Sequence, residues 1–111
     1  MISMGSRRQT QVEETLAHLA MDFLAREAGV KALITVTHAE VAPTFKNVTV
    51  YFSVLPQTME EQALKFAKRS RSDFRAYIKE HSFLHPIPVV DFEIDLGEKN
   101  RQRIDELTRH K

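Results

Sequence analysis

The chain of 111 residues contains no cysteine and no tryptophan, and it has only three glycines. The lack of cysteine excludes disulfides, thiolate nucleophiles and zinc sites with cysteine ligands, and it is compatible with a reducing cytoplasm. No apolar run approaches the roughly 18 residues that a transmembrane helix needs. The first eight residues also lack the apolar core of a signal peptide. We therefore expect a cytoplasmic protein with no membrane partner.

Length and composition are those of one globular domain, with 42% hydrophobic and 28% charged residues. We expect this domain to span residues 8–111, after a flexible N-terminus at residues 1–7. The formal net charge is only +1, so binding to nucleic acid cannot be argued from the whole chain. The charge is uneven, however, because residues 65–79 carry six basic side chains and a single acid, Asp73.

The segment from residue 58 to residue 81 is the main feature of the sequence. Thr58 and Glu61 have the spacing of a capping box, which predicts that a helix begins there. Along this segment, apolar side chains fall on one helical face and basic side chains on the other. Ser70 and Ser72 interrupt the pattern, since serine competes for backbone hydrogen bonds and prefers helix caps. We expect two short helices joined at a kink, with Ser72 as the N-cap of the second.

Before this segment, the sequence predicts one helix and two strands. Thr10 and Glu13 form another capping pair, and apolar residues at helical spacing follow them until Gly29. Residues 32–41 are rich in β-branched side chains, and residues 46–55 alternate strictly between apolar and polar. Because only four residues separate the two strands, they should form an antiparallel hairpin.

After the kinked helices, residues 89–96 alternate again and predict a third strand. Asp91, Glu93 and Asp95 should then point away from the core. Residues 98–111 suggest a short docked helix or a frayed tail. The predicted core consists of Val36, Val41, Val48, Val50, Phe52, Val54, Leu64, Phe74, Ile78, Val90, Phe92 and Ile94.

The predicted order is α-β-β-α-α-β, which gives a two-layer α+β domain with helices over one face of a sheet. This order agrees with a type II KH domain, with a kinked helix pair in place of a GxxG loop. Residues 34–41 (ITVTHAEV) and 46–55 (KNVTVYFSVL) resemble the hairpin of the ribosome-binding factor A family. Residues 87–92 (IPVVDF) resemble the last strand of that family and its approach.

Residues 104–107 (IDEL) resemble the family's C-terminal ending, so the resemblance runs from about residue 8 to residue 107. It implies a cytoplasmic assembly factor that binds the small ribosomal subunit, helps its rRNA to mature, and is not an enzyme. The family is also linked to growth in the cold. The implied partners are the small subunit and its rRNA, with assembly GTPases as candidates, and we expect a monomer. The family's Ala-x-Gly at the kink is replaced here by residues 70–72 (SRS).

Clustered Lys and Arg favour phosphate contact, because they release counterions when they bind RNA. The rival interpretation is a solvated helix surface whose charges aid solubility. We take the basic face as the predicted RNA footprint, with two serines setting the kink. The predicted RNA-binding residues are Lys65, Lys68, Arg69, Ser70, Arg71, Ser72, Arg75 and Lys79.

Other candidate sites have simpler interpretations. Tyr51 and Tyr77 have the rings to stack on bases, but packing at the edge of the sheet or core is favoured. His81 and His85 have helical spacing, but Pro86 and the lack of a third ligand nearby argue against a metal. The alternating acids of the third strand suggest an exposed face that resists edge pairing rather than paired catalytic carboxylates. We expect no catalytic residue, no metal and no cofactor.

A second function remains open at this point. The same KH-like fold would serve as a protein-interaction module that docks a partner through its acidic strand or its C-terminal tail. Strong salt dependence of RNA binding would favour the rRNA-binding hypothesis. Co-purification with one protein in the absence of RNA would favour the interaction module.

Overall fold

The computed structural model describes residues 7–27 and 32–97 of the chain. Two of the expected motifs, the helix stop at Gly29 and the C-terminal segment 98–111, lie outside these residues. The elements within them are α1 (Arg7–Glu27), β1 (Leu33–Val41), β2 (Asn47–Leu55), the short 3-10 helix η1 (Gln57–Met59), α2 (Glu60–Arg69), α3 (Arg71–His81) and β3 (Val89–Ile94).

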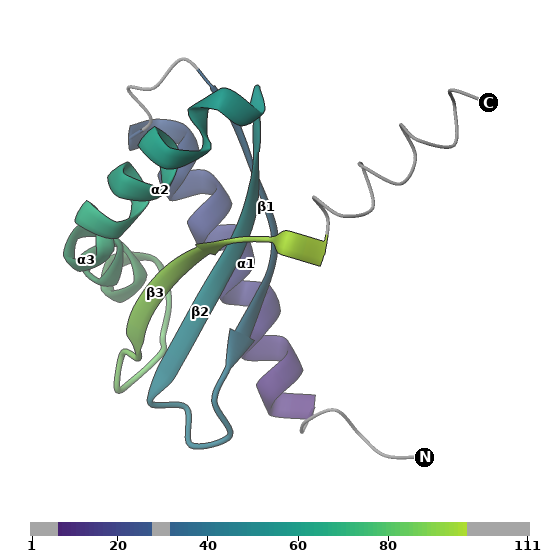
Figure 1. Cartoon of the computed structure of the whole chain (residues 1–111). Coiled ribbons are helices and arrows are strands. Elements are labelled where there is room, and N and C mark those ends of the chain that lie inside the picture. The colour runs from purple at the N-terminus through teal and green to yellow at the C-terminus, as the bar shows by residue number, and fades with distance from the viewer. Residues whose placement is uncertain (1–6, 28–31, 98–111) are drawn as a thin grey trace.

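The three strands form one sheet in the order β1-β2-β3. β1 and β2 are an antiparallel hairpin, as predicted, whereas β3 runs parallel to β2 after the crossover through α2 and α3. The helices lie on one side of the sheet, with α1 behind the strands in Figure 1 and α2 and α3 beside β3. The predicted α-β-β-α-α-β order and the two-layer α+β, KH-like architecture are therefore confirmed.

The core lies between the sheet and the helices. The alternation along β2 turns Val48, Val50, Phe52 and Val54 inward, and all four are buried. Phe52 packs edge-on against Phe92 of β3, with their ring centroids 6.4 Å apart. The predicted core residues are buried except for two, and those two are half-buried against it: Leu64 and Ile94.

Both predicted capping boxes are wrong. α1 begins at Arg7, so Thr10 lies within the helix and Arg7, which we expected in the flexible N-terminus, is helical. α2 begins at Glu60 after η1, which contains Thr58. For the first pair, the reason is a tertiary contact. The Glu13 carboxylate accepts a hydrogen bond of 2.8 Å from the backbone N–H of Val41, which is distant in the sequence, and so does not cap the start of its own helix.

Candidate RNA-binding face

Ser70 forms the break between α2 and α3, which confirms the predicted kink. Its backbone N–H donates to the carbonyl oxygens of Phe66 and Ala67, and its hydroxyl also donates to the Phe66 carbonyl at 2.9 Å. The Ser70 carbonyl accepts the first hydrogen bond of α3, from the N–H of Phe74 at 2.8 Å. One buried residue thus ends the first helix and starts the second.

Ser72 is not the N-cap of the second helix, so that prediction is wrong. α3 already begins at Arg71, because the hydrogen bond between Phe74 and Ser70 opens it two residues before Ser72. The structure places Ser72 on the exposed first turn of α3. Of the two serines predicted at the kink, Ser70 therefore has the structural role.

Lys68 does not point freely into solvent. Its Nζ atom lies 2.9 Å from a carboxylate oxygen of Asp91 and 2.9 Å from one of Glu93, both on β3. The hydrogen bonds to Glu93 and Asp91 raise the pKa of Lys68 above its ordinary value. Lys68 is therefore a fixed cation that attaches α2 to the open face of the sheet.

Asp91 is the acidic partner of two basic residues. Its Oδ1 atom also lies 3.3 Å from Nη1 of Arg71, and it accepts a hydrogen bond from the N–H of Phe92. Burial alone would raise the pKa of Asp91, but the hydrogen bonds from Lys68 and Phe92 and the two positive charges outweigh it and lower that pKa. The acidic strand is thus partly neutralised by the face that we predicted to bind RNA.

Arg75 is also held within the molecule. Its guanidinium donates to the carbonyl oxygens of Pro88 and Ile87, each at 3.0 Å, in the link between α3 and β3. A guanidinium has five N–H donors, so the two that are used leave others facing outward. Arg75 keeps its charge and sets the position of the link.

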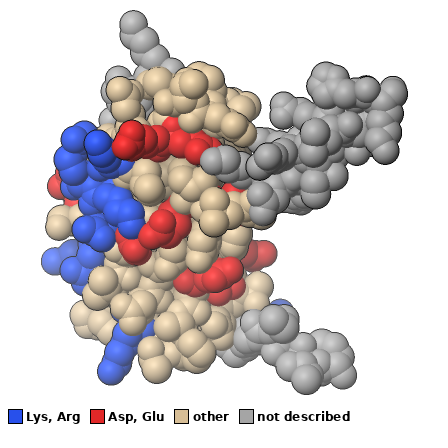
Figure 2. Space-filling view, viewed as in Figure 1, with Lys and Arg blue, Asp and Glu red and all other residues tan. Residues whose placement is uncertain are grey.

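Three of the predicted residues remain as exposed cations. Within the described part of the chain, Lys65, Arg69 and Lys79 make no ion pair. Lys65 and Arg69 are four residues apart on α2, which puts them on one side of that helix. Figure 2 shows Lys and Arg side chains gathered along the edge formed by α2 and α3, next to the acids of the open sheet face.

The two tyrosines are half-buried, and each stacks on a neighbouring exposed histidine of the same chain. The Tyr51 ring lies parallel to that of His38 at 4.6 Å, and Tyr77 stacks on His81 at 3.9 Å. Burial and the nearby carboxylates, first that of Glu40, raise the pKa of Tyr51, so its hydroxyl stays neutral at physiological pH. Tyr77 packs against the core, as favoured, whereas Tyr51 lies on the open face of the sheet beside His38.

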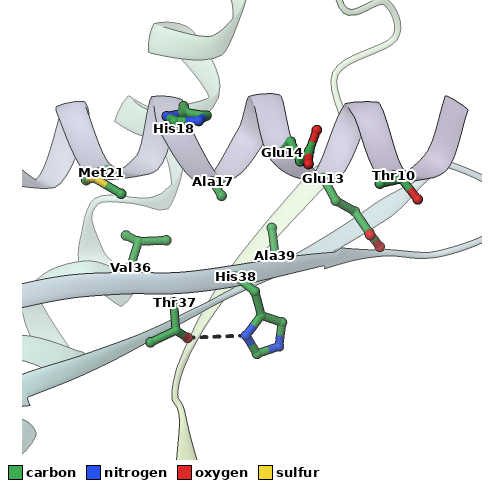
Figure 3. A pocket seen from close by; sticks show the side chains of 10 residues that line it. All are labelled: Thr10, Glu13, Glu14, Ala17, His18, Met21, Val36, Thr37, His38 and Ala39. Carbon is green, nitrogen blue, oxygen red and sulfur yellow. Dashed lines mark hydrogen bonds between the residues drawn. The ribbon is translucent and has the colours of Figure 1, made fainter. Parts of the chain in front are cut away.

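A groove of about 440 Å³ runs between α1 and β1 (Figure 3). It lies beside the point where the pairing of β1 with β2 shifts by one residue, between Val36 and His38. Gln9 and Glu13 of α1 bind the backbone of Val41 at the end of β1, the first at its carbonyl and the second at its N–H. These two side chains therefore satisfy the backbone hydrogen bonds that a further strand would make with Val41 at the free edge of β1.

The sequence analysis missed the pairing between the basic helices and the acidic strand. The signal was present in the alternation of Asp91 and Glu93 on a strand that must lie beside the helices in a β-α-α-β unit. Among the described residues, no three His, Asp or Glu side chains come together as a metal site. None of the helices in the same part of the chain has the length and apolarity to span a bilayer.

The sequence of this chain is similar to those of known proteins over nearly its whole length. A family model described as ribosome-binding factor A matches residues 7–108. Two curated proteins named ribosome-binding factor A, from Bradyrhizobium sp. strains ORS 278 and BTAi1, are 27% and 29% identical over 110 residues. Each match covers 95% of this chain and 80% of the relative.

Solved structures share the fold at lower identity. The crystal structure of ribosome-binding factor A from Thermus thermophilus matches with a TM-score of 0.68 and 17% identity, over 78% of this chain and 94% of that one. A solution structure from Thermotoga maritima, of a putative ribosome binding factor A, gives 0.67 and 21%, over 82% and 91%. A Thermus thermophilus model fitted into a cryo-EM map of a 30S complex gives 0.58 and 20%, over 79% and 91%.

Proposed function

This chain belongs to the ribosome-binding factor A family, and from that premise we propose that it binds the small ribosomal subunit and assists maturation of the subunit's rRNA. It acts in the cytoplasm as a single KH-like domain and a monomer, by binding rather than by catalysis. The relative from Thermus thermophilus that was fitted into a map of a 30S complex supports this choice of partner. Assembly GTPases are the candidate proteins that act beside it.

The exposed cations of the kinked helix pair are the observation that carries the proposal. Lys65, Arg69 and Lys79 are exposed and make no ion pair with any other described residue, so their charges are available to phosphates. Each phosphate contact releases condensed counterions and makes binding weaken with salt. These three residues are the proposed primary contacts with rRNA.

The three basic residues whose side chains are held by hydrogen bonds within the molecule, Lys68, Arg71 and Arg75, have a different role in this proposal. Lys68 and Arg71 are held by Asp91, and Arg75 is held by the link before β3, so none of them reorients freely. A partly neutralised Lys contributes less to long-range attraction than a free one. We assign these three residues to fixing the kinked pair against β3, with Ser70 at the break, while Arg75 retains donors for a phosphate.

Sedimentation with purified small subunits tests the proposal. The variant is Lys65→Gln, Arg69→Gln and Lys79→Gln, which removes three exposed charges and disturbs no described ion pair. It should stay folded by circular dichroism and leave the subunit fraction at a lower salt concentration than the wild type. The slope of log affinity against log salt should flatten by about 0.7–0.9 for each phosphate that is no longer bound.

A matched control separates this face from net charge. Gln11→Glu, Thr15→Glu and Ala25→Glu change the charge of the chain by the same amount, at exposed positions of α1. This control should sediment with subunits as the wild type does. Equal release of both variants would assign the effect to overall charge, and no release of either across a salt series would reject the helix pair as the rRNA contact.

The interaction-module hypothesis has less support. Asp91 and Glu93, the acids expected to dock a partner, already form ion pairs with Lys68. A basic partner would have to compete with Lys68 for these two carboxylates. RNA-independent binding of one protein that survives nuclease treatment would nevertheless favour that hypothesis over the rRNA proposal.

A further inference from the structure

A second surface of the molecule carries a hollow whose lining differs from the basic helix face. A hollow of about 310 Å³ lies where the start of α1, the turn between β1 and β2, and the link between α3 and β3 meet. Aromatic, aliphatic, proline and basic side chains line it, and its described lining includes no carboxylate. Arg8, Phe45, Phe83 and His85 give it its chemical character.

Phe83 is the most exposed large apolar side chain of the described residues. Its relative exposure is 105%, as for a Phe in an extended peptide. The backbone around it is nevertheless held: the Ser82 hydroxyl donates to the Ile78 carbonyl at 2.8 Å and accepts from the Leu84 N–H at 3.2 Å. The link thus presents an apolar ring to solvent on a fixed support.

Phe45 reaches the same hollow from the turn between β1 and β2. Its φ angle is +61°, a left-handed conformation that is unusual for an aromatic residue and costs of order 1–3 kcal/mol. Its N–H donates to the Ala42 carbonyl at 2.8 Å, which holds the turn in this form. Backbone strain of this kind gathers at binding sites, where it positions a side chain.

Arg8 supplies the charge of the site. Its guanidinium carbon lies 5.3 Å from the centre of the Phe45 ring, an arrangement that orients the planar cation over the hollow. Arg8 is exposed, and no described carboxylate forms an ion pair with it. Its N–H donors therefore stay available to an anion beside the aromatic rings.

We propose that this hollow binds an unpaired base of single-stranded RNA, with Phe83 stacking on the base and Arg8 contacting the adjacent phosphate. The inference rests on the proposed function and adds an unpaired nucleotide to the target. Positive charge without carboxylates selects a polyanion, and exposed aromatic rings select the flat face of an unstacked base. A duplex offers no such face, because its bases are already stacked.

The link between α3 and β3 connects the hollow to the basic helices. Arg75 of α3 donates to the carbonyl oxygens of Ile87 and Pro88, in the same link that carries Phe83. A strand of rRNA that contacts Lys79 on α3 would therefore meet the hollow at the end of that helix. The structure thus joins a backbone-contacting face to a base-contacting site through one short segment.

The test measures binding of a short unstructured RNA that contains one 2-aminopurine, whose fluorescence reports the binding. The same RNA with an abasic site in place of that base serves as the competitor. Phe83→Ala should weaken binding at least about fivefold, because removing one stack costs that much, and should leave the salt slope unchanged. Phe83→Tyr should restore binding to within about twofold of the wild type. Arg8→Gln should lower the salt slope by about 0.7.

Leu33→Ala is the matched control, since Leu33 is an exposed apolar residue at the far end of β1, and it should bind as the wild type does. Equal binding of Phe83→Ala and wild type, or of abasic and intact RNA, would overturn this inference alone if the wild type still sediments with small subunits. Loss of subunit binding by Phe83→Ala with unchanged RNA affinity would assign the hollow to a ribosomal protein and overturn the RNA proposal. A wild type that binds neither RNA nor subunits would overturn both proposals.

Discussion

Lys68 on α2 and Asp91 on β3 form an ion pair of 2.9 Å across 23 residues of sequence. The pair joins the basic helix face to the acidic strand, which sequence analysis had treated as separate surfaces. Because Glu93 and Arg71 extend it, four charged side chains form one network at the edge of the sheet. The charge available to a partner is therefore smaller than the sequence suggests, and it is concentrated at Lys65, Arg69 and Lys79, with Arg75 the fourth described cation of this face outside the network.

The first prediction concerns the pH dependence of this network. The folded-state pKa of Asp91 lies below its ordinary value of 3.8, so the unfolded chain binds a proton more readily than the folded one. The ion pair therefore stabilises the fold above about pH 4 and is lost as pH falls through the folded pKa. Asp91→Asn should lower the free energy of unfolding by less than about 1 kcal/mol at pH 7, because the site is partly exposed.

Urea titrations at pH 7 and pH 3 measure this effect. The difference between Asp91→Asn and wild type should shrink at the lower pH. Asp22→Asn, at an exposed position of α1 with no described ion pair, should change little at either pH. A difference that stays constant between the two values would show that the charge of Asp91 is not what stabilises the contact.

The second prediction concerns the break between α2 and α3. Ser70 is only 9% exposed, whereas Ser72 is exposed on the next turn. Ser70→Leu should cost about 1–3 kcal/mol, because extra methylenes enter a packed site. Ser72→Leu should stay within about 0.5 kcal/mol of the wild type in the same denaturant titration. Equal costs would mean that the kink does not depend on a small buried residue.

The third prediction concerns the register of β2. Phe52 is fully buried, so Phe52→Ala should lower the free energy of unfolding by about 3–5 kcal/mol. Tyr51→Ala, on the opposite face, should cost clearly less, because that ring loses mainly its stack on His38. Thermal or urea unfolding of both variants measures the difference, and similar losses would contradict the observed register.

Much of this fold follows from local patterns in the sequence. The alternation in residues 46–55 and 89–96 indicates which side chains face the core, since a shift of one residue would expose Phe52 and Phe92, although the third strand ends at Ile94, two residues earlier than predicted. The apolar face of residues 60–81 requires contact with the sheet, and Ser70 marks the break. These features depend on spacing along the chain, which is why they were predictable.

The helix starts and the ion pairs were not predictable in the same way. The capping pattern at Thr10 competes with a tertiary partner that the sequence does not reveal, since Glu13 binds Val41, and the pattern at Thr58 falls within the short helix η1. The state of Lys68 likewise depends on the packing of α2 beside β3. Residue type predicted the basic side chains of the candidate site, but only their three-dimensional neighbours separate the exposed cations from the tied ones.

The last prediction concerns the free edge of β1. The Glu13 carboxylate accepts a hydrogen bond from the Val41 N–H, and the Gln9 amide donates to the Val41 carbonyl at 2.7 Å. Glu13→Ala leaves that half-buried N–H without its partner, so the free energy of unfolding should fall by about 1–3 kcal/mol. Amide exchange at Val41 should become faster, while that at Val50 in the central strand should change only with global stability.

Glu14→Ala is the control for helix propensity and charge, because Glu14 is the exposed neighbour of Glu13 on α1. This variant also removes one carboxylate from α1 but leaves the contact with Val41 intact. Its free energy of unfolding should therefore stay within about 0.5 kcal/mol of the wild type. An exposed strand edge is also a template for pairing with a second chain. Glu13→Ala should therefore show more association than Glu14→Ala in sedimentation velocity at high protein concentration. If both variants exchange the Val41 amide at the wild-type rate, the Glu13 contact does not protect the edge.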